Sequence, residues 1–201
     1  MSVPFLKSVV RRLSHYKINV LHLHLSDDPG WRVEVNKYPE LTVETSFWPT
    51  RQPGKFYTQE DIKSICDFCD SLNIRVIPEI DMPGHSAAFR KAIGKDMQTP
   101  EGMQVLKEAL DEIIPLFKDS LFHIGSDEVH FKMKEFMPEM IRYVRSKGKQ
   151  VVVWYPGYAP DSNAVRMCWG EYEAGYSLDK SAPYIDCNGF YMDWMDSQLS
   201  L

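Results

Sequence analysis

The hydrophobic residues of this chain follow a helical spacing in some stretches and a strand-like alternation in others. Residues 3–16 place apolar side chains three and four positions apart, beginning beside Pro4, which suits the first turn of a helix. Residues 19–25 alternate instead, so that His22 and His24 share one face and leucines share the other. The pattern predicts a helix that is followed at once by a strand.

The two patterns keep alternating along the chain. Capping residues precede two later helical stretches, Thr58 in one and Thr99 with Pro100 in the other. The connection 26–56 is long enough to carry small elements or function. The predicted helices cover 3–16, 58–72, 99–117 and 132–147. The predicted strands cover 19–25, 75–80, the apolar run from 121, 150–154, 165–169 and 188–193.

Strands that alternate with helices pair in parallel through right-handed crossovers. Such units build either an open doubly wound sheet or part of a barrel. Polar and aromatic residues follow nearly every strand, which favours the barrel, because an open sheet concentrates them at one switch point. No glycine-rich nucleotide-binding motif occurs. We therefore predict an α/β fold, a (β/α)8 TIM-type barrel that is incomplete with about six strands, in a single domain spanning 1–201.

Composition narrows the class of protein and its partners. With 201 residues, 44% hydrophobic and 25% charged, the chain resembles an ordinary soluble globular protein. The 28 acidic and 23 basic residues give a formal charge of −5 without a basic block, which argues against nucleic acid as a partner. No apolar run is long enough for a membrane span, and no signal peptide is evident. These features assign no compartment.

The four cysteines do not indicate a disulfide scaffold or a metal site. Cys66 and Cys69 have CxxC spacing, but they lie within a helical pattern and lack the histidine or second pair that zinc requires. We predict reduced, partly buried thiols, and no metal or other cofactor.

The strongest candidate chemistry is the pair of adjacent carboxylates at the end of a predicted strand, Asp127 and Glu128. Two close carboxylates cannot both ionise cheaply, so one pKa should rise and supply a proton donor beside an anion. That combination suits glycoside cleavage. The alternative is that both residues merely begin the next helix, where negative charge offsets the helix dipole.

Several motifs occur in a distinctive order along the chain. They are KINVLHLHLSDD (17–28), GWR (30–32), YPEL (38–41), YT (57–58), VIPEIDMPGH (76–85) and HIGSDE (123–128). Together they resemble the catalytic domain of family 20 glycoside hydrolases, the β-N-acetylhexosaminidases, from about Pro4 to Asp193. The resemblance implies a barrel that hydrolyses terminal non-reducing β-linked GlcNAc or GalNAc without a cofactor.

The resemblance also implies a mechanism, substrate-assisted hydrolysis, which is an exception to the scheme with an enzyme nucleophile. The acetamido oxygen of the sugar attacks the anomeric carbon, and water later opens the oxazolinium-type intermediate with net retention. By motif position, Glu128 resembles the general acid that becomes the base. Asp127 resembles the residue that orients the acetamido group and stabilises its charge. The expected state is a protonated Glu128 beside an ionised Asp127.

The remaining site residues also follow from the resemblance. His85 resembles the histidine that supports the acid, paired with an aspartate of the Asp27-Asp28 motif, for which we prefer Asp27. His22 and His24 are expected to be structural or to support site residues without touching the substrate. The residues that resemble the substrate-binding set are Trp154 and Trp169 as pocket walls, Tyr191 for the acetamido oxygen and Asp193 for sugar hydroxyls.

The chain departs from the family pattern in three respects. Ser126 replaces the second glycine of the usual turn, which is unfavourable if that position needs positive φ. Pro156 stands where the family often has an acid. The matching region lacks the first and last barrel strands and the sugar-binding residues they carry. We therefore expect open edges, as in a fragment, a truncated reading frame or a chain that self-associates with another copy.

Two other functions fit the sequence. The first is a catalytically silent remnant that binds N-acetylated sugars or acts as an interaction module. The second is a metal-dependent barrel hydrolase that uses His22, His24, His85 and Asp127, since such residues at strand ends also build metal centres.

Overall fold

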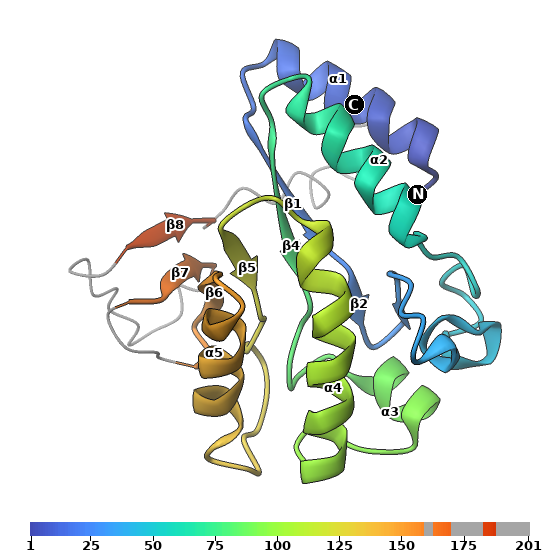
Figure 1. The fold of residues 1–201 in the computed structure, drawn as a ribbon, viewed down its shortest axis with the longest axis vertical. Coiled ribbons are helices and arrows are strands. Elements are labelled where there is room, and N and C mark those ends of the chain that lie inside the picture. The colour runs from blue at the N-terminus through green and yellow to red at the C-terminus, as the bar shows by residue number, and fades with distance from the viewer. Residues whose placement is uncertain (159–162, 170–182, 188–201) are drawn as a thin grey trace, which may run out of the picture.

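The centre of the molecule is a parallel sheet whose strands lie side by side in the order in which they occur along the chain (Figure 1). A computed structural model describes residues 1–158, 163–169 and 183–187. Strands in sequential order form a barrel wall, whereas a doubly wound sheet reverses its order. The predicted incomplete barrel is therefore confirmed. The six strands are β1 (Val20–His24), β4 (Arg75–Glu79), β5 (Leu121–His123), β6 (Gln150–Tyr155), β7 (Val165–Cys168) and β8 (Tyr184–Asp186).

The sixth strand differs from the prediction in its place along the chain. The strand predicted at 188–193 lies outside the described residues, and the described strand that pairs with β7 is Tyr184–Asp186. The long connection after β1 carries small elements, as expected. These are the antiparallel strands β2 (Ser26–Asp27) and β3 (Gly30–Trp31) and the 3₁₀ turns η1 (Pro39–Thr42) and η2 (Glu44–Ser46).

The four predicted helices form, and a fifth short helix was not predicted. Figure 1 shows α1 and α2 packed together near one end of β1 and β4, while α4 and α5 lie in front of the sheet. The unpredicted helix is α3, which follows the loop after β4. The helices are α1 (Val3–His15), α2 (Gln59–Asp70), α3 (Ala87–Ile93), α4 (Pro100–Ile113, continued by η3, Ile114–Leu116) and α5 (Phe136–Ser146).

The capping signals are borne out in the structure. Thr58 and Asp61 form a reciprocal capping box, in which each backbone N–H donates to the other side chain at 3.0 Å. Thr99 accepts from the N–H of Gly102 at 3.0 Å and so caps α4. Local side-chain chemistry therefore defines where α2 and α4 begin.

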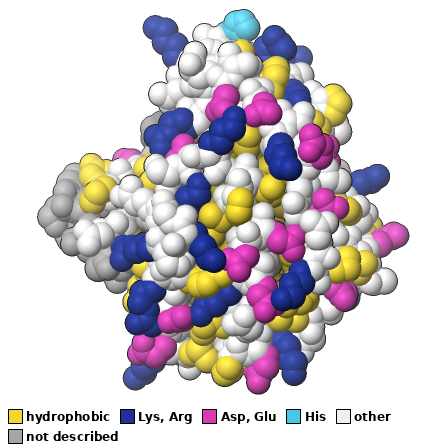
Figure 2. All heavy atoms as spheres, in the orientation of Figure 1, with side chains coloured by type: hydrophobic (Ala, Val, Ile, Leu, Met, Phe, Trp, Pro, Cys, Tyr) yellow, Lys and Arg dark blue, Asp and Glu magenta, His cyan; other side chains and the backbone are white. Residues whose placement is uncertain are grey.

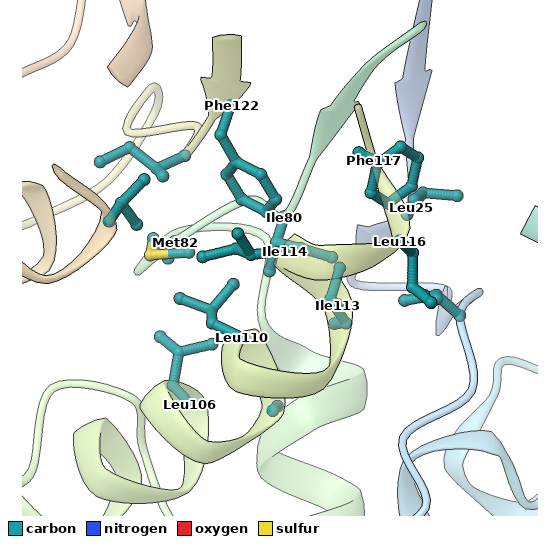
Figure 3. Close-up of a cluster of buried hydrophobic side chains, with 14 of the residues drawn as sticks. Leu25, Ile80, Met82, Leu106, Leu110, Ile113, Ile114, Leu116, Phe117 and Phe122 are labelled. Atoms are coloured by element: carbon teal, nitrogen blue, oxygen red, sulfur yellow. The ribbon is translucent and has the colours of Figure 1, made fainter. Parts of the chain in front are cut away.

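The sheet buries its two faces differently. Figure 3 shows Leu106, Leu110 and Ile113 of α4 against Ile80 and Met82, which follow β4. Alternate residues of the central strands point to opposite faces. The inner face carries a second apolar cluster, built from Val152, Val165 and Met167 with Leu121 and Trp154 packed on it. At the carboxyl ends of β1, β4 and β5 the residues on this face are polar, namely His24, Glu79 and His123.

The surface seen in Figure 2 mixes basic and acidic side chains and gathers neither sign in one place. In the part of the chain that the structure describes, no helix is both long and apolar enough to cross a membrane. No disulfide joins the four cysteines, all of which the structure describes, and the three buried ones include the CxxC pair within α2. Burial raises the pKa of Cys66 to about 11, which keeps it protonated and unreactive at neutral pH.

Candidate active site

The two adjacent carboxylates lie on a tight turn at the carboxyl end of β5. Strand-like hydrogen bonding continues past β5, because the N–H of Trp154 donates to the carbonyl of Gly125 at 2.9 Å. The chain then turns through positive φ at Gly125 (67°), Ser126 (96°) and Glu128 (47°). A Cβ at Gly125 would lie 1.7 Å from a carboxylate oxygen of Asp81, so only glycine fits there.

The turn directs these carboxylates into the site and not into a helix. Helix α5 begins at Phe136, eight positions after Glu128. The alternative that Asp127 and Glu128 start the next helix is therefore wrong.

A cavity of about 590 Å³ opens at this end of the sheet. It is lined by five of the predicted site residues, His85, Asp127, Glu128, Trp154 and Trp169, together with Asp186 and Cys187, which were not predicted. The other two predicted substrate-binding residues, Tyr191 and Asp193, lie outside the described residues. Segments at or after the ends of five strands, β4 to β8, thus converge on one cavity.

His85 stands between acidic groups from both sides. Its Nε2 lies 3.5 Å from Glu128 Oε2 and 3.9 Å from Asp127 Oδ1, and its Nδ1 lies 3.6 Å from Asp27 Oδ1. Asp28 is engaged elsewhere, since its Oδ1 accepts from the N–H of Ala87 at the start of α3. The geometry thus brings Asp27 to His85, although it lies behind the cavity lining.

The two adjacent carboxylates differ in burial, which affects the pKa of Asp127 in a way that the sequence did not predict. Burial raises the pKa of Asp127, partly offset by His85. The side chain of Asp127 is 15% exposed and that of Glu128 is 60% exposed. The sequence assigned the proton to Glu128 and the anion to Asp127. In the structure, burial favours the protonated form of Asp127 instead.

Acidic neighbours also change the pKa of His85. Burial opposes its protonation, but Asp81, Asp127 and Asp27 outweigh burial and raise the pKa of His85.

Asp81 is a buried carboxyl that sequence reasoning did not single out. It lies two positions after β4, and its Oδ1 accepts from the N–H of Ser126 at 3.2 Å. Burial, Glu79 and Asp127 raise the pKa of Asp81 to about 7. The signal that could have found it is the alternation along this segment, which puts Asp81 on the same face as Glu79.

A polar layer lies beneath the cavity, on the inner face of the sheet. The register pairs His24 with Glu79 and Glu79 with His123, so all three share one face. Glu79 and His123 are fully buried. Neither was predicted as a site residue, although each ends a strand on the same face as the two predicted structural histidines.

The metal set considered from sequence does not come together. Among the described residues, no candidate group joins His22 or His24 with His85 and Asp127. The groups whose ligand atoms lie within 4.8 Å of one another are His22–Glu79–His123, Asp27–Asp28–His85 and Asp81–His85–Asp127. Each of the three groups contains a histidine that is paired by charge with a carboxylate of the same group, which suits a polar network.

Comparison with known proteins shows the family. The sequence model of the glycosyl hydrolase family 20 catalytic domain matches residues 1–104, more than half of the chain. The chain belongs to glycosyl hydrolase family 20. The matched part includes His85, the Asp27-Asp28 pair and the Glu79–Asp81 segment.

Curated relatives and solved structures agree with this assignment. A β-hexosaminidase from Vibrio furnissii is 32% identical over 74% of this chain and 34% of its own length. A β-N-acetylhexosaminidase from Cellulomonas fimi is 34% identical over 76% of this chain and 36% of its own length. This chain thus spans about a third of these family 20 relatives.

The structural likeness extends beyond residue 104. A chitobiase from Flavobacterium johnsoniae superposes with a TM-score of 0.83 and 27% identity, over 97% of this chain and 37% of that one. A mutant β-hexosaminidase from Streptomyces plicatus, solved in complex with the product GlcNAc, has a TM-score of 0.75 and 29% identity over 90% of this chain and 41% of that one. The coverage of 97% includes most of the cavity-lining segments.

Proposed function

We propose that this family 20 chain hydrolyses terminal non-reducing β-linked N-acetylhexosamine residues by a retaining, substrate-assisted mechanism. The observation that carries the proposal is the single cavity of about 590 Å³ in which Asp127, Glu128 and Trp154 meet. A carboxylate pair beside indole walls suits a sugar that carries an acetamido group. The product complex of the Streptomyces plicatus relative supports GlcNAc as the ligand class.

Asp127 is the group that orients the acetamido substituent. Its Oδ1 is buried and has no hydrogen-bond donor among the described residues. The N–H of an acetamido group would supply that donor, and an ionised Asp127 would then stabilise the positive charge on the oxazolinium-type intermediate. The indole N–H of Trp169 is likewise buried without an acceptor in the described part of the chain. A sugar oxygen would supply that acceptor.

Glu128 is the acid that protonates the leaving oxygen and the base that later activates water. His85 Nε2 lies 3.5 Å from Glu128 Oε2, so the imidazole and the carboxyl group can exchange a proton. Asp27 lies beside Nδ1, on the other side of the imidazole. Because the sugar supplies its own nucleophile, no enzyme nucleophile is needed.

The test compares two substrates that differ in their need for an acid. 4-Nitrophenolate leaves without protonation, whereas the second sugar of N,N′-diacetylchitobiose requires it. We expect Glu128→Gln to lower kcat at least about 100-fold on the disaccharide. With the nitrophenyl glycoside, the rate of the glycosylation step should fall by a smaller factor, because its leaving group needs no proton. Asp127→Asn should lower kcat on both, and the exposed Glu135→Gln should change neither.

A matching nitrophenyl β-glucoside, which lacks the acetamido group, should not be cleaved. Cleavage of that glucoside at a comparable rate, or wild-type activity in Glu128→Gln on the disaccharide, would contradict the mechanism.

One observation favours a second candidate, binding of N-acetylated sugars without turnover. The Glu128 side chain is 60% exposed, whereas a general acid works best in a site that excludes water. Saturable binding of GlcNAc by a chain that cleaves neither substrate would favour this candidate.

A further inference from the structure

The proposed mechanism leaves one buried charge unexplained, the carboxylate of Glu79. This residue ends β4 and its side chain is fully buried below the cavity. Its Oε1 accepts a hydrogen bond from the indole N–H of Trp154 at 2.7 Å. Its Oε2 lies 2.9 Å from both His22 Nε2 and His24 Nδ1. Groups from β1 and β6 therefore converge on a single side chain of β4.

The charge at Glu79 is stabilised by its neighbours. A buried carboxylate without partners is strongly unfavourable. Burial alone would raise the pKa of Glu79, but the surrounding histidines hold it below its ordinary range. Burial also opposes the charge on His24, yet Asp27 and Glu79 raise the pKa of His24 to about 10. At neutral pH the arrangement is an anion paired with the His24 cation.

His123 completes the arrangement as a neutral ring. Burial lowers the pKa of His123 to about 3, and its Nδ1 accepts from the N–H of Gly125 at 3.0 Å. The ring packs beside Trp154 with centroids 4.6 Å apart. The Trp154 indole thus packs against the His123 ring and donates its N–H to Glu79.

We propose that Glu79 is a positioning residue for the sugar pocket, which fixes the indole of Trp154 as a wall of the cavity and holds His24 behind it. Trp154 lines the cavity, and an aromatic ring contributes to sugar binding when its plane is already fixed before the sugar arrives. A carboxylate suits this position because Oε1 accepts from the indole of Trp154, while Oε2 faces the imidazoles of His22 and His24. The inference rests on the proposed function only for the identity of the sugar.

The same anion begins a series of alternating charges that reaches the acid residue. His24 Nε2 lies 3.7 Å from Asp27 Oδ2, and Asp27 Oδ1 lies 3.6 Å from His85 Nδ1. Since His85 lies 3.5 Å from Glu128, the pocket wall and the acid are supported by one continuous set of groups. Glu79 itself lines no part of the cavity, so it acts through Trp154 and His24.

The first arm of the test needs no sugar. In the intact chain, ¹⁵N–¹H spectra report each indole N–H, and Trp154→Phe assigns the signal of Trp154. We expect Glu79→Leu to shift this signal and speed its exchange with water at least about 10-fold, whereas Glu79→Gln, which retains an acceptor oxygen, preserves most of the protection. The buried indole of Trp31, which donates to the carbonyl of Val33 at 2.8 Å, is the internal reference for an intact fold.

The second arm titrates GlcNAc into the folded variants. Glu79→Leu should raise Kd about 10-fold, and adding this change to Trp154→Phe should raise it little further, because the two residues act as a pair. If Glu79→Leu leaves the exchange of the Trp154 indole equal to that of the wild type, or if Trp154 exchanges as fast as the exposed Trp48, the inference is wrong. A folded wild type that binds no GlcNAc would contradict the proposed function, and the indole measurements would still decide the role of Glu79.

If Glu79→Leu fails to fold, Glu79→Gln and Trp154→Phe carry the same comparison. The inference expects any loss of protection in Glu79→Gln to be small and confined to Trp154, with the Trp31 indole unchanged. A lower melting temperature with equally faster exchange at Trp154 and Trp31 would show a solely structural Glu79 and would also overturn the inference.

Discussion

At the scale of single residues, the site shows how neighbours in sequence acquire different chemistry. Asp127 and Glu128 are adjacent, yet the first is mostly buried beside Asp81 and the second reaches the cavity mouth. Burial favours the neutral form of Asp127, so an approaching acetamido group must favour its ionised form by hydrogen bonding. The turn that carries them also places Ser126, just before Asp127, at a φ of 96°.

Replacing Ser126 with glycine should stabilise the chain. Its φ of 96° is unfavourable for a residue with a Cβ, and a strained position of this kind costs about 1 kcal/mol or more. We expect Ser126→Gly to raise the free energy of unfolding by about 1 kcal/mol relative to Ser126→Ala, measured by urea denaturation. Ser126→Ala keeps the strain and loses only the hydroxyl. A glycine variant less stable than the alanine variant would contradict this account.

The His24 proton should make stability depend on pH. Its pKa is about 10 in the folded chain against an ordinary value of 6.5, because Asp27 and Glu79 outweigh burial. Between these values the folded chain binds more protons than the unfolded chain, so the free energy of unfolding falls as pH rises. The contribution is complete below pH 6.5 and is lost progressively towards pH 10. Urea denaturation from pH 6.5 to 8.5 should show a shallower decline in His24→Gln, whereas His15→Gln on α1 should leave the slope unchanged.

At the scale of elements, local signals located most helices but not all boundaries. α2 and α4 begin where capping residues predict, because their caps are built from side chains within three positions. α5 was predicted from residue 132 and begins at Phe136. The residues between Glu128 and Phe136 lead the chain from the site back to the start of this helix. α3 was missed, since it has only seven residues and its start is held by Asp28, far away in sequence.

The capping box of α2 offers a direct test at this scale. Thr58→Ala removes the acceptor for the N–H of Asp61, which should lower the free energy of unfolding by about 1 kcal/mol. Thr50→Ala, at an exposed position, is the matched control. Equal stability of the two variants in urea would show that the cap contributes nothing.

At the scale of the whole molecule, the sequential order of six parallel strands makes a barrel wall with two edges in the described part of the chain. β1 forms one edge and pairs only with β4 among the described strands. Unpaired edges are ready templates for another strand. That 1–201 forms one domain, and that the chain binds neither nucleic acid nor membrane, stay predictions.

We propose that the chain self-associates through the β1 edge. Val20 is 37% exposed on that edge, and a charge there should oppose strand pairing. Sedimentation velocity over a concentration series should show an increasing average mass for the wild type and a smaller increase for Val20→Lys. Val43→Lys, at a comparably exposed valine outside the sheet, should behave as the wild type. A wild type that remains monomeric at all concentrations would end this proposal.

The sequence by itself determined the barrel-type fold, because alternating helical and strand periods with polar residues at strand ends leave few other arrangements. It also identified five of the seven residues that line the cavity, because those residues stand at or just after the ends of predicted strands. Only the tertiary structure decided how protons and partners are distributed among them. The pKa of Asp127 depends on burial, and the roles of Glu79 and Asp81 depend on neighbours from other strands, which no local pattern in the chain contains.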